Sequence, residues 1–398
     1  MDNNQKSNYQ KAACSILLAG ITGFAALHCL QPVIPVIGND LNLLPATASI
    51  LIAAGMLGMA GMLILLTLFA ERLPRKRSII CGLIFCSLLT IILASLTQLP
   101  LMLLVRFLEG ISIAFIPTLI MAYIQEELPA EKTAYLARLY ISGTTIGGLT
   151  GRLGLSFFTD AFNWRLALGI LGTILLILAL TVAWLLPKES KCITKTNSFS
   201  WNIFSWENKH LFFICFIGFA IMGNYVAACN FIAYVLRSSP YNFSQSTIGL
   251  IFLAQIFGSF SSALSSRVVK HFGVIHVIAA NLIVMLIGII ITGLSAAMWK
   301  IAGLCAINFA LFGAHACLTS LCSQICPNQK AAATALYMFC YYCGASVIGS
   351  LGGIFFQNFG WNGIITMIAA LCLLSMLSIF IFWQSSGSYK AKIAQLHL

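Results

Sequence analysis

The sequence is poor in charged residues, and acidic residues are the scarcest of them. Only 8% of its 398 residues are charged and only 10 are Asp or Glu, whereas 60% are hydrophobic. A soluble globular protein carries roughly 25% charged residues. Because so few charges cannot cover the surface of a soluble core of this size, the composition argues against a soluble enzyme, a nucleic-acid-binding protein and a disordered scaffold.

The sequence also lacks the common motifs of nucleotide-dependent and metal-dependent enzymes. It has no GxGxxG at a strand-to-helix turn, no Walker loop and no HExxH. We therefore predict that the protein is neither an enzyme nor a self-contained ATP-driven pump, and that it needs no cofactor or metal. The 14 cysteines are scattered, mostly inside apolar runs, which is unlike the spaced cysteines of secreted disulfide-rich proteins.

Long apolar runs are what the sequence has instead. A membrane-crossing helix needs about 20 mainly apolar residues. The first run is too long for the core of a signal peptide and has no convincing cleavage site, so we count it as a helix. We predict an all-α membrane protein with twelve transmembrane helices. The expected helices are residues 12–37, 46–70, 78–96, 100–123, 134–158, 165–186, 211–236, 247–269, 274–294, 301–322, 331–356 and 363–383.

The positive charges agree with this helix count. If the N-terminus is cytoplasmic, 17 of the 22 Lys and Arg residues fall in cytoplasmic loops and termini. Only Arg165, Arg237 and Lys300 fall in loops on the opposite side. The positive-inside rule demands such a bias. We therefore predict a multi-pass protein in a lipid bilayer with both termini cytoplasmic, and we attribute the net charge of +12 to orientation rather than to nucleic-acid binding.

Residues 187–210 form the only long polar segment, and we predict that they are a cytoplasmic linker. They separate a predicted six-helix bundle at residues 1–186 from a second bundle, with a short cytoplasmic tail, at residues 211–398. Parallel six-helix repeats place a substrate path at their interface, which favours a transporter over a membrane-bound enzyme. The halves share residues at a constant offset of 197: Leu139, Tyr140, Gly147, Phe158 and Trp164 match Leu336, Tyr337, Gly344, Phe355 and Trp361.

Three segments resemble motifs of the major facilitator superfamily. Residues 71–77 (ERLPRKR) resemble its signature loop, Gly-x3-Asp-Arg-x-Gly-Arg-Arg/Lys, although Thr67, Glu71 and Pro74 replace the Gly, the Asp and the second Gly. Residues 106–110 (RFLEG) are similar to its Arg-x3-Gly element. Residues 143–151 are similar to its antiporter element, Gly-x3-Gly-Pro-x2-Gly-Gly, with Gly148 at the proline position.

Residues 28–32, 140–143, 163–165 and 360–363 look in addition like segments of the YnfM-type bacterial inner-membrane transporters. The resemblance implies two pseudo-symmetric six-helix bundles that carry out secondary transport by alternating access in the bacterial inner (plasma) membrane. It also implies that the loop after the second helix is a conformational latch, which we prefer to the alternative of ordinary charged cytoplasmic surface. The latch residues would be Glu71, Arg72, Arg75 and Lys76.

Only three charged residues lie within the expected helices and more than four residues from a helix end: Arg106, Glu109 and Arg152. A charge at mid-helix costs roughly 2.5–3.5 kcal/mol on insertion scales, so each needs an explanation. Arg106 and Glu109 share a helix face and can pair. One interpretation is a buried ion pair that joins the fourth and fifth helices. The other is that Glu109 binds a proton or cation while Arg106 favours its ionised form; by resemblance, Arg106 matches the arginine implicated in proton movement.

Polar and aromatic residues in the helices expected to face a pore suggest a substrate site. We prefer four of them, with two further candidates. A mixed aromatic and amide lining would suit a neutral or amphipathic organic solute, whereas hydrogen bonding between helices is the alternative for each residue. The preferred four are Gln31, Asn224, His315 and Tyr341, and the further two are His28 and Tyr225.

Gly143, Gly147 and Gly151 recur every four residues and share one helix face. Such a face permits close helix packing, and the antiporter element implies a seal at the bundle interface as the alternative.

Taken together, these observations favour a proton-coupled exporter of a small organic compound such as a sugar or drug. A proton-coupled importer and, from another class, a non-transporting sensor or assembly factor stay open, as do the substrate and the oligomeric state.

Overall fold

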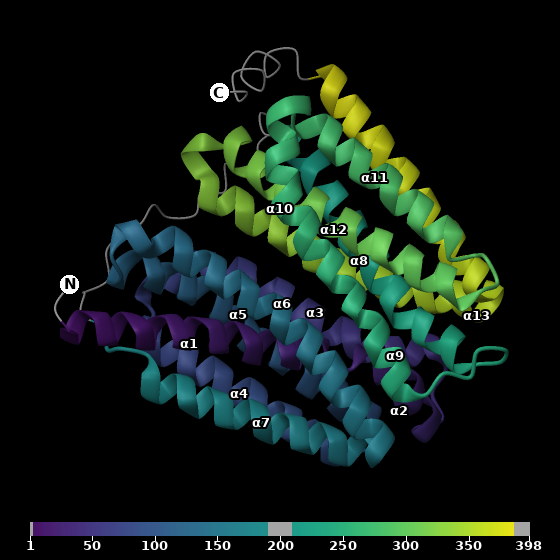
Figure 1. Cartoon of the computed structure of the whole chain (residues 1–398), viewed down its shortest axis with the longest axis horizontal. Coiled ribbons are helices and arrows are strands. Elements are labelled where there is room, and N and C mark those ends of the chain that lie inside the picture. The colour runs from purple at the N-terminus through teal and green to yellow at the C-terminus, as the bar shows by residue number, and fades with distance from the viewer. Residues whose placement is uncertain (1–2, 190–208, 386–398) are drawn as a thin grey trace. The chain divides into compact units, whose positions relative to one another are not determined.

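The computed structural model describes residues 3–189 and 209–385, and within these ranges it consists of helices and short connections without strands (Figure 1). The chain divides into two compact units. Unit 1 comprises residues 1–42, 54–198 and 244–250, and unit 2 comprises residues 43–53, 199–243 and 251–398. Most of the predicted linker, residues 190–208, lies outside the described residues.

Unit 1 contains the helices of the first half of the chain together with α9. The first span is interrupted, since α1 stops at His28. After a turn at residues 29–30, the chain continues as a short 3-10 helix that contains Pro32, and only then as an α-helix. The elements are α1 (Asn3–His28), η1 (Gln31–Val33), α2 (Ile34–Asp40), most of α3 (Pro45–Phe69), η2 (Ala70–Arg72), α4 (Arg75–Ser95), α5 (Leu99–Glu127), α6 (Ala130–Ala161), α7 (Trp164–Leu185) and α9 (Gln245–Ile251).

Unit 2 contains the remaining helices. Its last helix carries a sharp turn at Gly360, whose φ of 60° and ψ of −149° suit a residue without a Cβ. The elements are α8 (Lys209–Arg237), η5 (Phe252–Ala254), α10 (Gln255–Phe272), α11 (Val274–Ile291), α12 (Ala297–Ile325), η6 (Pro327–Gln329) and α13 (Lys330–Ser385).

Ten segments of the described chain are long and apolar enough to cross a membrane. The last of them, Lys330–Gln384, contains the turn at Gly360 and therefore supplies two spans rather than one. The less apolar α6, with 32 residues, supplies a further span. The predicted twelve-helix architecture is thereby confirmed.

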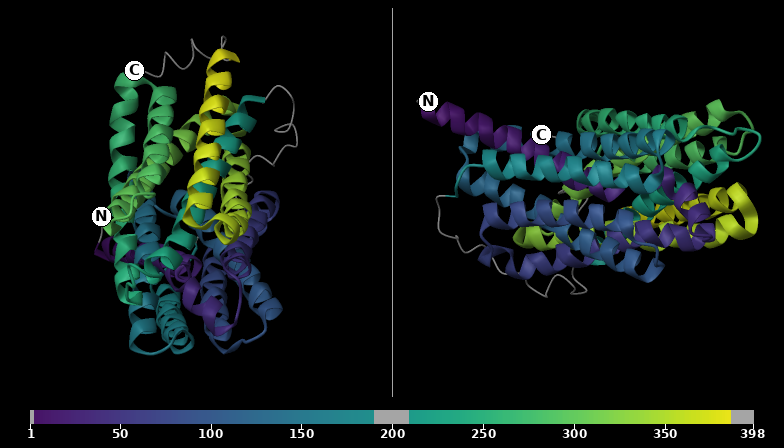
Figure 2. Two further views of the ribbon diagram at one scale, coloured as in Figure 1. Left: turned by 90° about the vertical axis from the view of Figure 1, so that its right-hand side faces the viewer. Right: turned by 90° about the horizontal axis from the view of Figure 1, so that it is seen from below.

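The three glycines of α6 lie against the backbone of α1, and the two helices run side by side (Figures 1 and 2). A side chain at any of the three positions would collide with α1. A Cβ at each position would come within 2.5 Å of a backbone carbonyl oxygen of α1. The carbonyl belongs to Leu17 for Gly143, to Ile21 for Gly147 and to Ala25 for Gly151. This face therefore packs closely against α1 within unit 1.

The same contact recurs in unit 2. Gly344 of α13, the counterpart of Gly147, lies against the carbonyl oxygen of Phe219 on α8. Helices α8 and α13 are in turn neighbours along much of their length. The match of Gly147 with Gly344 at an offset of 197 residues thus corresponds to an equivalent helix contact in the two halves.

Candidate functional site

The buried charges of unit 1 form a network centred on α5. Arg106 and Glu109 lie one helical turn apart, and Nη1 of Arg106 donates to Oε2 of Glu109 at 2.5 Å. Both side chains are about 1% exposed. Because each charge neutralises the other, the pair can remain in the protein interior, where an isolated charge would be strongly disfavoured.

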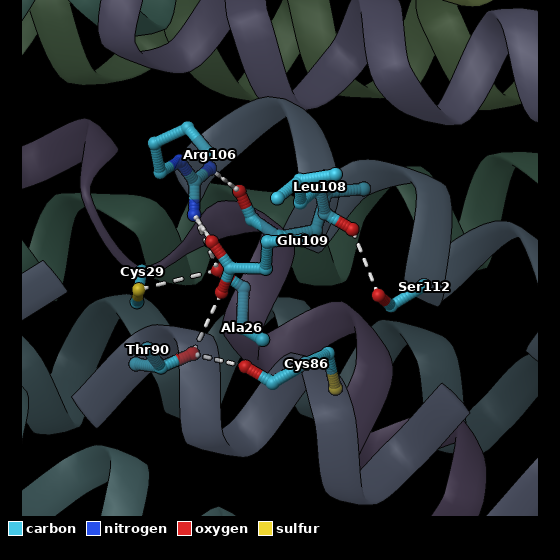
Figure 3. A network of polar contacts seen from close by, with 9 residues as sticks. Ala26, Cys29, Cys86, Thr90, Arg106, Leu108, Glu109 and Ser112 are labelled. Carbon is cyan, nitrogen blue, oxygen red and sulfur yellow. Dashed lines mark hydrogen bonds and ion pairs between the residues drawn. The ribbon is translucent and has the colours of Figure 1, made fainter. Parts of the chain in front are cut away.

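The second carboxylate oxygen of Glu109 also has a partner, which comes from α4. The hydroxyl of Thr90 lies 2.6 Å from Oε1 of Glu109 and 2.9 Å from the carbonyl oxygen of Cys86 (Figure 3). Both oxygens of the carboxylate therefore accept hydrogen bonds, one from a cation and one from a neutral hydroxyl. Thr90 could not be identified from the sequence, since a single threonine in an apolar helix has no distinctive pattern.

Arg106 also binds the end of α1. Its guanidinium donates to the carbonyl oxygens of Ala26 at 3.3 Å and Leu27 at 3.0 Å. The last carbonyls of a helix have no partner within the helix, and α1 ends at His28. The break in the first span thus exposes acceptors that the fork of an arginine can reach.

The remaining predicted residues of unit 1 continue this network. Arg152 of α6 donates from Nε to Oε1 of Gln31 at 2.8 Å and from Nη1 to the carbonyl oxygen of Gly148 at 2.9 Å. Gln31 in turn shares a side-chain hydrogen bond with His28, which lies near both arginines. The structure therefore brings together the predicted proton-coupling residues and two of the predicted substrate residues, all of them buried.

The predicted substrate residues of unit 2 fall into two groups. His315 hydrogen-bonds through Nδ1 to the hydroxyl of Tyr337 at 2.9 Å, and its ring lies 4.5 Å from that of Tyr341. Tyr225 is buried and lies near Tyr341.

Asn224 lies apart from this cluster. Its amide nitrogen contacts Sδ of Met285 at 3.8 Å and Sγ of Cys372 at 3.5 Å, on α11 and α13. These contacts are internal to unit 2.

The predicted latch is tied to unit 1 through two of its four residues. Arg75 is buried and donates to both carboxylate oxygens of Glu126, at the end of α5, at 2.9 and 2.8 Å. Lys76 binds Glu189 through its backbone N–H at 3.3 Å, and its ammonium donates to the carbonyl oxygen of Leu186. Glu71 and Arg72 lie in the short helix η2.

Glu126 had a signal in the sequence that could have been used. It is one of two adjacent glutamates that follow the fourth apolar run. In the predicted topology, these glutamates lie on the same cytoplasmic side of the membrane as the basic loop at residues 71–77. Lys76 has no such signal, since its partners lie in the chain that follows α7.

An all-α chain of twelve spans in two units, with a buried charge network in the first, defines a polytopic membrane transport protein. The family model of the Major Facilitator Superfamily matches residues 16–350. The chain belongs to this superfamily, and it is a transporter of a small solute rather than an enzyme.

Related proteins match the chain over nearly its whole length. The inner membrane transport protein YnfM of Escherichia coli is 32% identical and is covered over 89% of its length, with 93% of this chain aligned. An uncharacterized MFS-type transporter of Bacillus subtilis, YybF, is 29% identical, with 92% of each chain aligned.

Solved structures show the same fold at low identity. The nucleoside transporter NupG superimposes with a TM-score of 0.76 at 15% identity, over 93% of this chain and 99% of that one. A bacterial homologue of the lysosomal transporter Spinster, in an inward-facing conformation, superimposes with a TM-score of 0.70 at 16% identity, over 98% of this chain and 96% of that one.

Proposed function

We propose that the protein exports a small organic solute across the bacterial inner membrane by proton-coupled alternating access, with both termini in the cytoplasm. One observation carries the proposal: Glu109 is the only carboxylate in the described part of the chain that is buried, and it lies within a membrane-spanning helix. Intramembrane ionisable residues are expensive to bury and mark proton pathways in transporters. We infer that Glu109 takes up and releases the coupling proton.

The network around Glu109 supports this role. A carboxylate that is stabilised by one cation and one hydroxyl can be discharged by a proton without leaving the cation unbonded, because Arg106 keeps its bonds to the carbonyls of α1. A charge that moves through 100 mV supplies roughly 2.3 kcal/mol. This energy corresponds to an approximately fifty-fold concentration ratio of the solute.

Each unit, taken by itself, carries neutral groups of a kind that would bind the solute. In unit 1, Gln31 and His28 supply amide and imidazole groups beside Arg152. In unit 2, His315 and Tyr341 supply two rings that lie close together at a tilt. Neutral polar groups and aromatic faces suit an uncharged or amphipathic compound, such as a sugar or a drug. Asn224 supports this site least, since its amide contacts sulfur atoms inside unit 2.

The proposal is tested in proteoliposomes that contain a pH-sensitive dye. A panel of sugars, nucleosides and lipophilic cations is first screened for thermal stabilisation of the purified protein, and the best compound serves as the transport probe. We expect a gradient of this compound to drive proton movement through the wild-type protein. Glu109→Gln should abolish proton movement and retain counterflow, whereas the exposed Glu131→Gln should change neither.

The outcome separates the alternatives. Proton movement at the wild-type rate in Glu109→Gln would show that this residue does not take part in coupling. If no compound of the panel shows counterflow, the non-transporting sensor or assembly factor is favoured. Growth on toxic compounds, with and without the gene, decides the direction. Protection by the gene supports export, and sensitisation supports import.

A further inference from the structure

Thr90 has more acceptors within reach than its hydroxyl can serve. Its Oγ1 lies 2.6 Å from Oε1 of Glu109 and 2.9 Å from the carbonyl oxygen of Cys86 (Figure 3). The carbonyl oxygen can only accept a hydrogen bond, and so can Oε1 while the carboxylate is ionised. A hydroxyl has a single hydrogen to donate and two lone pairs with which to accept. Thr90 can therefore donate to one of these oxygens at a time, and it retains the capacity to accept.

We propose that Thr90 is a positioning residue that satisfies Glu109 in both of its protonation states by turning its hydroxyl. The inference rests on the proposed function, in which Glu109 exchanges a proton. When Glu109 is ionised, Thr90 donates to Oε1. When a proton binds Oε1, the new O–H donates to Oγ1 of Thr90, and the hydrogen of Thr90 turns to the carbonyl oxygen of Cys86. One proton is gained and no covalent bond is broken: the hydrogen bond between Thr90 and Oε1 reverses its direction, and the carbonyl oxygen of Cys86 gains the hydrogen bond that Oε1 no longer receives.

Arg106 determines which carboxylate oxygen receives the proton. Its guanidinium has only donors and already occupies Oε2 of Glu109 at 2.5 Å. A proton on Oε2 would face these donors, whereas a proton on Oε1 finds the lone pairs of Thr90. Oε2 then continues to accept from Arg106, so the same side-chain positions serve the charged and the neutral network.

The other titratable groups around Glu109 do not offer this exchange. The thiols of Cys29 and Cys86 interact with the carboxylate from the turn after α1 and from α4. Each thiol donates instead to a backbone carbonyl, at 3.3 Å to Ala26 and at 3.2 Å to Leu83.

Two further groups lie on the side of the arginines. His28 lies near Arg106 and Arg152 and shares a hydrogen bond with Gln31. Arg152 donates to Gln31 and to its own helix. In the network of Figure 3, the hydroxyl of Thr90 is thus the neutral group placed to accept a hydrogen bond from a protonated Oε1.

Infrared difference spectroscopy between acid and alkaline pH, on the purified full chain in lipid, tests the proposal without a transport substrate. A protonated carboxyl has its own carbonyl band, and the band that Glu109→Gln removes belongs to Glu109. We expect Thr90→Val to change the frequency of this band. We also expect the pH of its half-maximal amplitude to rise by about one to two units, because the ionised form loses a charge-assisted hydrogen bond.

Two variants give the comparison its specificity. Thr90→Ser retains the hydroxyl and should keep the wild-type midpoint. Thr22→Val makes the same substitution at a buried threonine whose hydroxyl bonds only the carbonyl oxygen of Leu18, at 2.8 Å, and should leave band and midpoint unchanged. If Thr90→Val does not fold, Thr90→Ala serves in its place with the same expectation.

The two levels of inference fail differently. If Glu109→Gln removes a band that the Thr90 variants leave unchanged in frequency and midpoint, Thr90 has no such role and Glu109 remains the proton site. If Thr90→Ser shifts the midpoint as far as Thr90→Val does, packing rather than the hydroxyl is responsible, and the proposal is overturned. If no band is lost in Glu109→Gln, the proton site itself is wrong.

Discussion

The guanidinium of Arg106 on α5 donates to the carbonyl oxygen of Leu27, 3.0 Å away in the last turn of α1. The same side chain donates to Glu109 at 2.5 Å. One cation therefore joins the broken end of the first span to the buried carboxylate. Any movement of this end along α5 would change the partners of the cation that stabilises Glu109, which couples the conformation of α1 to the charge of the site.

Replacing Arg106 with lysine should separate charge from geometry. Lysine retains the positive charge for Glu109 but lacks the planar fork that reaches several acceptors at once. We expect Arg106→Lys to lose at least one bond to a carbonyl of α1, with a stability loss of about 1–3 kcal/mol, and to slow proton-coupled transport. Thermal unfolding in detergent and the dye assay measure the two effects. The exposed Arg77→Lys is the control, and an unchanged melting temperature in Arg106→Lys would contradict the geometric role.

The glycine face of α6 allows a test with closely matched controls. In Gly147→Ala the new Cβ would lie within 2.5 Å of the carbonyl oxygen of Ile21. We expect the overpacking to cost about 1–3 kcal/mol and to lower the apparent melting temperature. Gly61 and Gly169 have no atom within 4 Å of such a Cβ. Alanine at these positions should be tolerated or stabilising, because alanine is the better helix former. Equal losses at all three positions would show that contact with α1 is not the cause.

The sequence was a good guide to features that depend on periodicity and repetition. Long apolar runs predicted the helices. The break between the predicted helices 331–356 and 363–383 corresponds to the turn at Gly360 within α13. The offset of 197 residues matched Gly147 with Gly344, and each of them lies against a backbone carbonyl of a neighbouring helix. Scarcity of charge also identified Arg106 and Glu109, because a charged residue within an apolar run is conspicuous.

Partners that depend on how each helix is rotated about its axis could not be predicted. Thr90 binds Glu109 because α4 presents this face to α5, and no pattern in α4 specifies that rotation. The carbonyls of Ala26 and Leu27 become acceptors only because α1 stops where it does. Asn224 illustrates the converse, since a polar residue in a central helix can point at sulfur atoms within its own unit.

Arg165 and Lys300, which we placed in loops on the predicted outer side, each donate to carbonyl oxygens at the end of a neighbouring helix. Arg165 donates to the carbonyl oxygen of Leu96 at 2.6 Å, just after α4. Lys300 donates to the carbonyl oxygens of Thr292 at 2.6 Å and Leu294 at 3.1 Å, just after α11. Cations near a helix C-terminus are stabilised by its unpaired carbonyls. These exceptions to the charge bias are therefore explained by helix capping in each unit.

The ion pair of the latch loop should be energetically coupled. Arg75 is buried and makes two hydrogen bonds to Glu126, so removal of either partner leaves the other without its counterion. We expect Glu126→Gln and Arg75→Gln each to lower the melting temperature. The double variant should lose less free energy of unfolding than the two single variants lose together, which corresponds to a coupling energy of about 0.5–3 kcal/mol.

The control for this cycle pairs Glu126→Gln with Arg77→Gln, since Arg77 is exposed in the same loop. This second pair should be additive. Additivity in the cycle of Arg75 and Glu126 would show that the bidentate contact contributes nothing to stability. Transport measured on the same variants then reports whether the loop also acts as a conformational latch.

The tryptophans matched by the repeat should act as equivalent anchors. Nε1 of Trp164 donates to Asp40 at 3.0 Å, and Nε1 of Trp361 donates to the hydroxyl of Thr292 at 3.0 Å. Phenylalanine keeps most of the ring but has no donor, so Trp164→Phe and Trp361→Phe should each cost about 1 kcal/mol. Because the anchors share no partner, the losses should add in the double variant. Trp184, which is 81% exposed, provides the control: if Trp184→Phe lowers the melting temperature as much as the other two, loss of ring area rather than of the indole donor explains the effect.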